Sequence, residues 1–454
     1  MSGSGKTTVK QLNIYMISLG CAKNLVESEV MLGHLPKDRY AIVTDEAQAD
    51  IILINTCAFV EEAKEESVDA ILDAAEYKTR GSCRLLAVCG CLPQRYSETL
   101  MRELPEADLL FGIGEIPHVA ELLEQALEQR TVAVNKTSYL YDHTTPRTRS
   151  SPFFSAYVKI SEGCDNHCAY CVIPSLRGPL RSREIASVVE ETRQLVASGV
   201  REINLVAQDV TAFGLDRGKR ELGALLRELV RIDDLGWLRV LYAHPAGIDD
   251  ELIDLVAGEE KICKYLDIPI QHIDDEILER MNRHTDSAGI RALLEKLRAR
   301  IPDVTLRTSL ITGFPGETDA QFARLLDFVQ EGWFDRIGVF RYSREEGTPA
   351  AEFPDQVPAR ISKLRLDRLM KAQKRISFRK NRALIGKVEP VLVEGVNEET
   401  DLLLRGRCAR QAPDVDGQVY ITAGQAVVGD IVPLRITDSS DYDLIGEIVE
   451  DEEL

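Results

Sequence analysis

The sequence lacks any long apolar segment. No uninterrupted apolar run reaches the roughly 18 residues that a membrane-spanning helix needs. Residues 1–13 are mostly polar and do not contain the apolar stretch of a signal peptide. The sequence therefore predicts a cytoplasmic protein that does not contact a membrane.

The sequence has fewer basic than acidic residues. The chain has 55 Lys and Arg against 74 Asp and Glu, which gives a formal net charge of −19. Such a surface opposes sequence-independent binding to nucleic-acid phosphates and suits a basic protein partner. One local basic face could still bind nucleic acid, so the net charge favours a protein partner without deciding the matter.

Structural disulfides are not expected, because a large cytoplasmic protein keeps its thiols reduced. The chain nevertheless has ten cysteines, and clustered cysteines then indicate metal or redox chemistry. Some cysteines fall outside any cluster and are interpreted as small buried hydrophobic residues, namely Cys83, Cys263 and Cys408.

The first residues contain a Gly-Lys-Thr-Thr string at positions 5–8. A phosphate-binding loop needs a preceding strand and an earlier glycine, and that glycine would fall before residue 1. We therefore expect residues 1–13 to form a disordered leader and not a nucleotide site.

Residues 14–142 alternate between strand and helix patterns. Apolar strands are predicted at 13–19, 50–55 and 84–88, with amphipathic helices at 24–35 and 61–77. This alternation is typical of a parallel α/β sheet. Each strand ends close to a cysteine, at the edge of the sheet where such folds bind ligands.

A Thr-, Ser-, Pro- and Arg-rich stretch at 143–155 is interpreted as a linker, and a second series of strands and helices occupies 156–382. Six strand–helix units in this length predict a partial (β/α)6 TIM-like barrel, with its active site at the carboxyl ends of the strands. The predicted strands cover residues 156–160, 202–206, 238–243, 265–269, 305–312 and 336–340.

The end of the chain differs from the rest. Residues 359–382 hold ten Lys or Arg against one acid in a helical pattern, which fits either a solvated connecting helix or a docking face for an acidic or nucleic-acid ligand. Residues 383–454 show short alternating strands typical of a small antiparallel β-barrel. From residue 385 onward there are 16 acidic and five basic residues, a net charge of −11.

The strongest motif is Cys164-x-x-x-Cys168-x-x-Cys171. Three thiolates in one short loop can bind three irons of a four-iron cluster, and without a local fourth cysteine one iron stays open for a substrate or cofactor. Zinc is the competing metal, but its sites pair two Cys-x-x-Cys units or add spaced histidines. His167 directly precedes Cys168 in the same tight loop and is a poor fourth ligand.

A second trio consists of Cys21, Cys57 and Cys91. Each residue follows a predicted parallel strand, so all three can converge above one edge of the sheet. Cys89 competes with Cys91, but Cys89 ends its strand while Cys91 begins the loop. The pattern favours a second three-cysteine cluster at Cys21, Cys57 and Cys91.

The loop at Cys164, including Tyr170 before the last cysteine, resembles the signature of radical S-adenosylmethionine enzymes. The resemblance implies that the cofactor chelates the open iron and that one electron from an external donor cleaves it to methionine and a 5′-deoxyadenosyl radical. A two-cluster electron carrier is an alternative, and it would not cleave the cofactor.

From residue 14 onward the chain resembles the methylthiotransferase family. The family has an N-terminal domain with one 4Fe-4S cluster, a radical core with another, and a C-terminal barrel called TRAM. The strings that carry the resemblance are SLGCAKNLVESE, INTCAFVEEAKEES, VCGCLPQRY, KISEGCDNHCAYCVIPSLRGPLRSR, NLVAQDVTAFG, DIPIQHIDDEILERMNR, TSLITGFPGET and YSREEGTPA.

Two branches of this family differ in substrate: one modifies an isopentenyladenosine of tRNA, the other an aspartate of the small-subunit ribosomal protein S-twelve. IPSLRGPLRSR, SREEGTPA and RGRCARQAPDVDGQVYIT resemble the protein-modifying branch. The acidic C-terminal segment fits independently, because ribosomal proteins are basic and tRNA is not. The expected reaction is methylthiolation of the aspartate β-carbon to 3-methylthioaspartate, at the expense of two S-adenosylmethionine molecules.

The resemblance also implies cofactor contacts outside the cysteines. Gln208 would contact the ribose or amino acid part of S-adenosylmethionine, Gly313 its adenine or methionine part, and Arg307 would neutralise its carboxylate. Tyr170, within the cluster loop itself, would be a further contact to the cofactor. Gly313 also fits a tight turn between a strand and a helix, and the two roles do not exclude each other.

Overall fold

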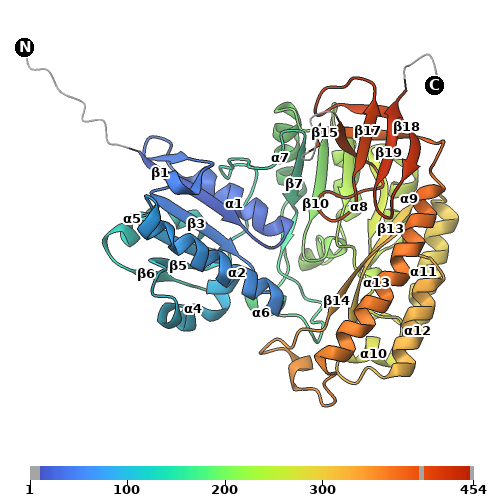
Figure 1. The fold of residues 1–454 in the computed structure, drawn as a ribbon, viewed down its shortest axis with the longest axis horizontal. Coiled ribbons are helices and arrows are strands. Elements are labelled where there is room, and N and C mark those ends of the chain that lie inside the picture. Colours follow the sequence, from blue (N-terminus) through green and yellow to red (C-terminus); the bar gives the residue numbers. More distant parts are fainter. Residues whose placement is uncertain (1–10, 398–402, 450–454) are drawn as a thin grey trace, which may run out of the picture. The chain divides into compact units, whose positions relative to one another are not determined.

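The structure is a computed structural model that describes residues 11–397 and 403–449. The Gly-Lys-Thr-Thr string and most of the predicted leader lie outside the described residues. The chain divides into two compact units, Met1–Ser150 with Cys171–Pro179, and Ser151–Tyr170 with Leu180–Leu454 (Figure 1). Within the described ranges, none of the helices combines the length and the apolar character that crossing a membrane requires.

The first unit contains a six-stranded parallel sheet in the order β2-β1-β3-β4-β5-β6. The predicted strands are confirmed as β1, β3 and β4, and every residue of β3 and β4 is buried, as expected for a covered parallel sheet. The bounds are β1 (Leu12–Ser18), β2 (Tyr40–Ile42), β3 (Ile51–Thr56), β4 (Leu85–Gly90), β5 (Leu109–Phe111) and β6 (Thr131–Ala133). The three strands that were not predicted are three residues long, too short for a periodic pattern.

The order of the strands reverses direction beside β1, because β2 lies on one side of it and β3 on the other. In doubly wound sheets the loops at such a point leave a crevice at the carboxyl edge. The main helices of this unit are α1 (Ala22–His34), α2 (Glu61–Ala75), α4 (Cys91–Glu103) and α5 (Val119–Glu128).

The second unit contains an open parallel sheet in the order β14-β13-β12-β11-β10-β7, which confirms the partial (β/α)6 barrel. The strands are β7 (Ser155–Lys159), β10 (Glu202–Val206), β11 (Trp237–Val240), β12 (Ile262–Asp267), β13 (Thr305–Thr312) and β14 (Arg336–Arg341). Amphipathic helices bury their apolar faces against this sheet in one continuous core. They are α7 (Ile185–Ala197), α8 (Leu222–Leu229), α9 (Asp250–Gly258), α11 (Ser287–Arg300) and α12 (Asp319–Gln330).

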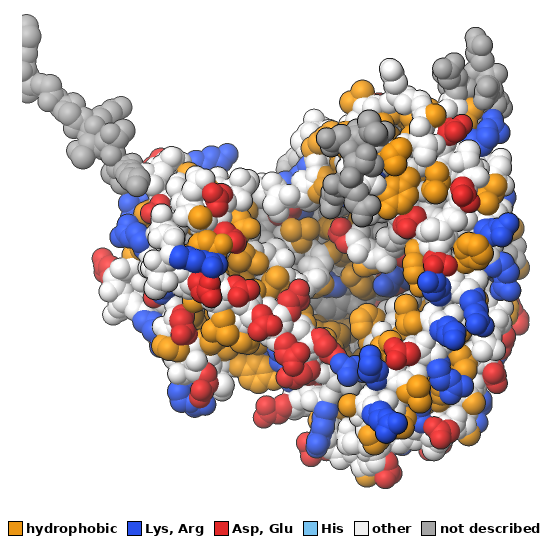
Figure 2. Space-filling model, in the orientation of Figure 1, with side chains coloured by type: hydrophobic (Ala, Val, Ile, Leu, Met, Phe, Trp, Pro, Cys, Tyr) orange, Lys and Arg blue, Asp and Glu red, His pale blue; other side chains and the backbone are white. Residues whose placement is uncertain are grey.

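The basic helix is α13 (Ala359–Arg382), and its bounds coincide with the prediction. Leu369 and Ile376 are buried in the core of the second unit, so α13 is more than a solvated connection. Leu364, by contrast, is 55% exposed. Figure 2 shows Lys and Arg side chains along the surface where α13 runs.

The C-terminal strands close into a small barrel in the order β15-β16-β17-β19-β18. Its bounds are β15 (Val388–Val396), β16 (Leu404–Cys408), β17 (Val419–Ala423), β18 (Ile431–Ser439) and β19 (Leu444–Ile448). All neighbouring pairs are antiparallel except β17 and β19, which run parallel.

Buried polar contacts join this barrel to the parallel sheet of the same unit. Arg407 of β16 forms an ion pair with Glu202 of β10 at 2.6 Å, and Arg239 of β11 pairs with the same carboxylate at 3.1 Å. The hydroxyl of Tyr157 in β7 donates to Asp414 at 2.9 Å. The C-terminal barrel is therefore packed as part of the second unit.

Candidate functional site

The first unit brings Cys21, Cys57 and Cys91 to one edge of its sheet. Cys21 stands immediately before α1, Cys57 immediately follows β3, and Cys91 is the first residue of α4. The strands that deliver them, β1, β3 and β4, are direct neighbours. The three thiols therefore lie together at the carboxyl edge of the sheet, at the switch point where α/β folds bind ligands.

Two glycines allow the cysteine loops to approach closely. Gly20 has a φ of +88°, and a Cβ atom there would lie 2.7 Å from the Cβ of Cys57. Gly90 has a φ of +95°, and a Cβ atom there would lie 2.3 Å from Oδ1 of Asn55. Only glycine combines this backbone conformation with this lack of space.

Asn24 of α1 and Thr56 of β3 tie these loops together. The Asn24 amide donates to the carbonyls of Leu19 and Thr56, both at 3.0 Å. The Thr56 hydroxyl donates to the carbonyl of Cys89 at 2.6 Å and accepts from the backbone N–H of Leu92 at 3.3 Å. These hydrogen bonds fix the ends of all three strands relative to one another.

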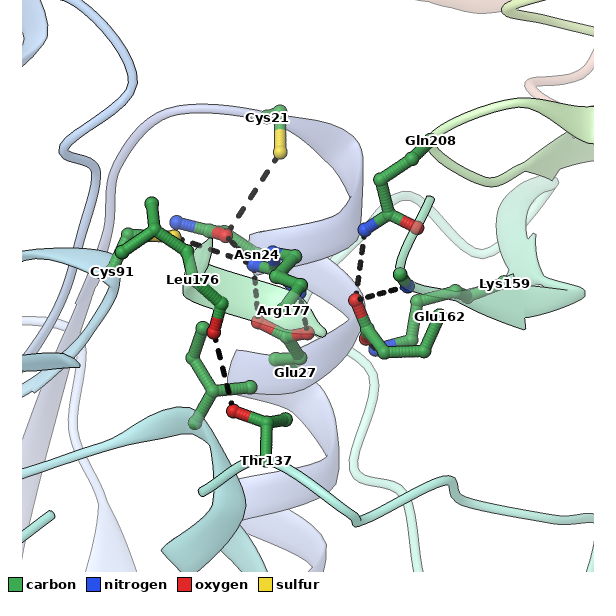
Figure 3. Close-up of polar contacts among 12 residues, drawn as sticks. Cys21, Asn24, Glu27, Cys91, Thr137, Lys159, Glu162, Leu176, Arg177 and Gln208 are labelled. Atoms are coloured by element: carbon green, nitrogen blue, oxygen red, sulfur yellow. Dashed lines mark hydrogen bonds and ion pairs between the residues drawn. The ribbon is translucent and has the colours of Figure 1, made fainter. Parts of the chain in front are cut away.

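A buried arginine lies against this trio. Arg177 is the last residue of the short helix α6 (Ile173–Arg177), and its segment belongs to the first unit. Its guanidinium pairs with Glu27 at 2.6 Å, donates to Oδ1 of Asn24 at 2.9 Å and donates to Sγ of Cys91 at 3.5 Å (Figure 3). The cysteine site therefore includes a permanent positive charge.

The environment raises the pKa of the thiols. Burial raises the pKa of Cys57 to about 12, with a further contribution from the nearby thiols of Cys91 and Cys21. Burial also raises the pKa of Cys91, and Arg177 opposes that rise. Buried thiols that must be thiolates to bind metal need positive charge beside them. Three converging sulfurs beside a guanidinium therefore fit an iron–sulfur cluster.

Cys89 has a different environment. It lies within β4, is fully buried, and its Sγ contacts the sulfur of Met31 at 3.6 Å. Burial raises its pKa well above the usual value. Cys89 therefore packs in the core, while Cys91 lies beyond the strand at the start of α4.

The second cysteine loop follows β7 and the short strand β8 (Ser161–Glu162). Within the second unit, Asn166 donates to Asp209 at 2.8 Å, and Asn282 donates to the carbonyl of His167 at 2.9 Å. His167 adopts a left-handed backbone conformation with a φ of 48°. The loop that carries Cys164 and Cys168 is thus anchored at the carboxyl end of the sheet. Cys171 begins the segment that groups with the first unit.

A second buried arginine serves this loop. Arg283 donates to Sγ of Cys168 at 3.3 Å and to the hydroxyl of Tyr170 at 3.5 Å. Burial raises the pKa of Cys164 to about 11. Each cysteine trio therefore has a guanidinium that donates to one of its sulfurs, which suits an anionic cluster.

Gln208 lies in a buried polar group at the carboxyl end of β7 and β10. Its amide donates to Glu162 at 2.8 Å, and the same carboxylate pairs with Lys159 at 2.6 Å (Figure 3). Glu162 directly precedes Gly163 and Cys164. Gln208 is therefore held next to the base of the cluster loop.

Gly313 directly follows β13 with a φ of +76°, and its backbone N–H donates to Glu317. A Cβ atom on Gly313 would lie 2.4 Å from the Cβ of Ser362 in α13. This close approach gives Gly313 a structural reason to be glycine, as the tight-turn interpretation predicts.

Arg307 lies near the start of β13, away from the carboxyl edge of the sheet. Its guanidinium pairs with Asp267 at 2.8 Å and lies 4.0 Å from Asp416 of the C-terminal segment. These carboxylates raise its pKa against the effect of burial. The guanidinium is thus ion-paired inside the protein, and its contact with the cofactor carboxylate stays a prediction.

Among residues 11–397 and 403–449, no group of three His, Cys, Asp or Glu side chains is arranged to hold a single metal ion. A four-iron cluster poses a different requirement, because each cysteine binds a separate iron. Within the first unit, the proximity of Cys21, Cys57 and Cys91 is compatible with such a cluster.

Three family models match successive parts of the chain. Uncharacterized protein family UPF0004 matches residues 13–112, the Radical SAM superfamily matches residues 158–329, and the TRAM domain matches residues 385–449. The middle match contains the Cys164 loop and the strands that hold it.

Relatives match over almost the full length. The chain is 66% identical to "Ribosomal protein uS12 methylthiotransferase RimO" of Syntrophotalea carbinolica, and the alignment covers 98% of each chain. The chain belongs to the RimO family. It is also 60% identical to the RimO protein of Geobacter sulfurreducens, over 96% of this chain and 98% of that one. As a RimO-family member it is a radical S-adenosylmethionine methylthiotransferase, with S-adenosylmethionine and 4Fe-4S clusters as its cofactors.

A solved structure shares the fold. The radical S-adenosylmethionine methyltransferase TsrM from Kitasatospora setae matches with a TM-score of 0.55 and 16% identity, over 75% of this chain and 77% of that one. At this identity the likeness shows the fold alone.

The sequence patterns pointed to the cysteines of this RimO-family chain but not to the polar residues around them. Cys21, Asn24 and Glu27 are spaced by three residues along one face of α1, and such a polar stripe on a buried helix is a usable signal. Arg177 had no local signal, because its contacts are 150 and 153 residues away in sequence.

Proposed function

We propose that this protein inserts a methylthio group at the β-carbon of one aspartate of ribosomal protein uS12, and so forms 3-methylthioaspartate. The observation that carries the proposal is the identity of 66% over 98% of both chains with a protein named for this activity. The three sequence strings typical of the protein-modifying branch support the same choice.

In this proposal Cys164, Cys168 and Cys171 bind the catalytic 4Fe-4S cluster. Three ligands leave one iron for S-adenosylmethionine, whose reductive cleavage supplies the radical that removes hydrogen from an unactivated carbon. The protein's own contribution is to hold the loop. Asn166, His167 and Arg283 do so through the hydrogen bonds described above.

Cys21, Cys57 and Cys91 bind the auxiliary 4Fe-4S cluster in the same proposal. Their convergence at the switch point of the sheet and the guanidinium of Arg177 support it. Methylation of a sulfur held at this site would use the second S-adenosylmethionine.

Gln208, Tyr170 and Gly313 remain the proposed contacts to the cofactor. Gln208 is held by Glu162 at the start of the cluster loop, and Tyr170 by Arg283. Gly313 directly follows β13 at the carboxyl edge of the same sheet. All three come from the second unit, which contains most of the Radical SAM match.

The domain boundaries proposed are 14–142 for the methylthiotransferase domain, 143–155 for the linker, 156–382 for the radical core and 383–454 for TRAM. The family-model matches fall inside these ranges, apart from the first residue of the first match.

The acidic barrel is the proposed contact for the basic substrate, and the structure narrows the residues involved. Of its 16 acids, seven lie outside the described residues. Four others are engaged within the unit, by Arg410, Arg407, Tyr157 and Tyr265. Of the five described acids that remain, Asp430, Asp438 and Glu447 are exposed.

The alternative substrate is tRNA, captured by the basic face of α13. Several of its charges are already paired, since Arg365 contacts Asp319, Lys374 contacts Asp441 and Lys380 contacts Asp335. This reduces the positive charge that α13 offers to phosphates.

The deciding experiment is anaerobic reconstitution followed by reaction with S-adenosylmethionine, dithionite and either purified uS12 or tRNA, read by mass spectrometry. We expect one methylthio group on a single aspartate of uS12, none on tRNA, and no product from Cys164→Ala. Methylthiolation of tRNA alone would overturn the proposal. Cleavage of S-adenosylmethionine without modification of uS12 would support the radical chemistry but not the proposed substrate.

A further inference from the structure

Arg177 is chemically unusual for its position. Its side chain is buried, and so is that of its ionic partner Glu27. Removing a charge pair from water is costly, and well-packed apolar residues often stabilise a fold at least as well. A buried pair that touches a cysteine of the site therefore suggests a role beyond holding the segment in place.

Both terminal nitrogens of the guanidinium form hydrogen bonds. Two nitrogens contact the two oxygens of Glu27 at 2.6 and 3.2 Å, and Nη2 also contacts Oδ1 of Asn24 at 2.9 Å. These contacts fix the plane of the guanidinium. The Cys91 sulfur lies 3.5 Å from Nη2, which donates to it (Figure 3).

We propose that Arg177 is a positioning residue that sets the reduction potential of the auxiliary cluster by donating to the Cys91 sulfur, and that Glu27 tunes this effect in the opposite direction. The inference rests on the proposed ligands Cys21, Cys57 and Cys91. Hydrogen bonds to cluster sulfurs and nearby charge are the means by which proteins adjust such potentials.

The sign of each effect follows from charge. The donated hydrogen bond and the positive charge of Arg177 stabilise the reduced, more negative cluster, so they raise its potential. The carboxylate of Glu27 stabilises the oxidised cluster and lowers the potential. Arg177 thus acts on the auxiliary cluster from the same nine-residue segment that begins with Cys171, a proposed ligand of the other cluster.

The matched control lies on the same helix. Glu29 of α1 is also buried and pairs with Arg147 at 2.6 Å, so it forms a comparable ion pair. Glu29 is two residues beyond Glu27 and faces residues 147–150 and not the cysteines. Substitutions of this pair disturb the unit in a similar way without touching the sulfurs.

The experiment uses the full chain with Cys164, Cys168 and Cys171 changed to Ala, so that only the auxiliary cluster is reconstituted. Iron and sulfide content establish that the cluster is present, and a redox titration followed by electron paramagnetic resonance gives its potential. The variants are R177K, R177M and E27Q, with R147K, R147M and E29Q as controls.

We expect R177M to lower the potential, R177K to lower it less, and E27Q to raise it, while the three controls leave it unchanged. Lysine keeps the charge but cannot reproduce the planar fork, which explains the smaller shift. If R177M does not retain iron, the opposite shifts of R177K and E27Q still carry the test.

Equal potentials in the Arg177 variants and the Arg147 controls would overturn the proposal. Shifts of the potential in the same direction in R177K and E27Q would also overturn it. A general structural disturbance of the site would not depend on the sign of the charge that is changed. Absence of iron in the triple-Ala chain is a separate outcome, because it removes the proposed ligand set and the role of Arg177 with it.

Discussion

Cys89 and Cys91 are two residues apart, yet one belongs to the core and the other to the site. Cys89 is enclosed by β4 and Met31. Cys91 begins α4 and accepts a hydrogen bond from Arg177. Gly90 separates them with a φ of +95° and lets the chain turn so sharply from strand to helix.

The first prediction separates these two cysteines. Cys91→Ala should cost roughly four iron atoms per chain after anaerobic reconstitution, because one ligand of a four-iron cluster is gone. Cys89→Ala should keep its iron and lose only packing, on the order of 1 kcal/mol of unfolding free energy. Iron and acid-labile sulfide assays check the first result and urea unfolding the second. Loss of iron in both variants would contradict the separation.

At the scale of elements, α13 and the C-terminal barrel are both built into the second unit. Helix α13 contributes Leu369 and Ile376 to the core that surrounds the parallel sheet. The barrel contributes Arg407 to a fully buried group around Glu202. Both α13 and the barrel are therefore packed parts of the second unit.

The second prediction concerns α13. Leu369→Ala should destabilise the protein by about 2–5 kcal/mol, because it empties a fully buried site. Leu364→Ala, five residues away on the same helix and 55% exposed, should change the unfolding free energy by less than about 0.5 kcal/mol. Equal effects in urea unfolding would mean that α13 does not pack on the sheet as described.

The third prediction concerns the junction at Glu202. Burial raises the pKa of this carboxyl, but Arg407 and Arg239 outweigh that effect and lower the pKa to about 2. The pKa is depressed on folding, so the stabilisation is complete above the ordinary value of 4.5 and is lost as the pH falls from 4.5 toward 2.

Urea unfolding of the apo protein should therefore show a loss of about 2 kcal/mol between about pH 5 and pH 3 that Glu202→Gln removes. The control is Glu251→Gln, which breaks the exposed pair with Arg227 and should leave the pH dependence unchanged. An unaltered pH dependence in Glu202→Gln would contradict the prediction.

At the scale of the whole molecule, charge is the property that bears on the substrate. The net charge of −19 works against binding to RNA and in favour of a basic protein. Asp430, Asp438 and Glu447 are the exposed barrel residues that we propose attract the basic substrate.

The fourth prediction follows. Raising the salt from about 0.05 M to about 0.3 M should increase KM for uS12 several-fold with little change in kcat, since salt screens attraction between exposed charges. Joint substitution Asp430→Asn, Asp438→Asn and Glu447→Gln should raise KM at low salt and weaken the salt dependence. Initial rates measured by mass spectrometry check both, and an unchanged KM in the triple variant would show that the substrate binds elsewhere.

The sequence by itself determined the two cysteine trios, the parallel architecture of both sheets and the C-terminal barrel. These features are local in origin, since the motif at Cys164 is contiguous and each longer strand has its own apolar run. The short strands β2, β5 and β6 and the parallel pairing of β17 with β19 were not predictable, because they depend on distant neighbours.

Tertiary structure decided what surrounds the cysteines. Arg177 reaches Glu27 across 150 residues, and Arg307 pairs with Asp267 across 40 residues. Burial and charge pairing are properties of residues brought together by folding. A sequence can thus show which side chains can bind a cluster, but only the fold shows which charges those side chains meet.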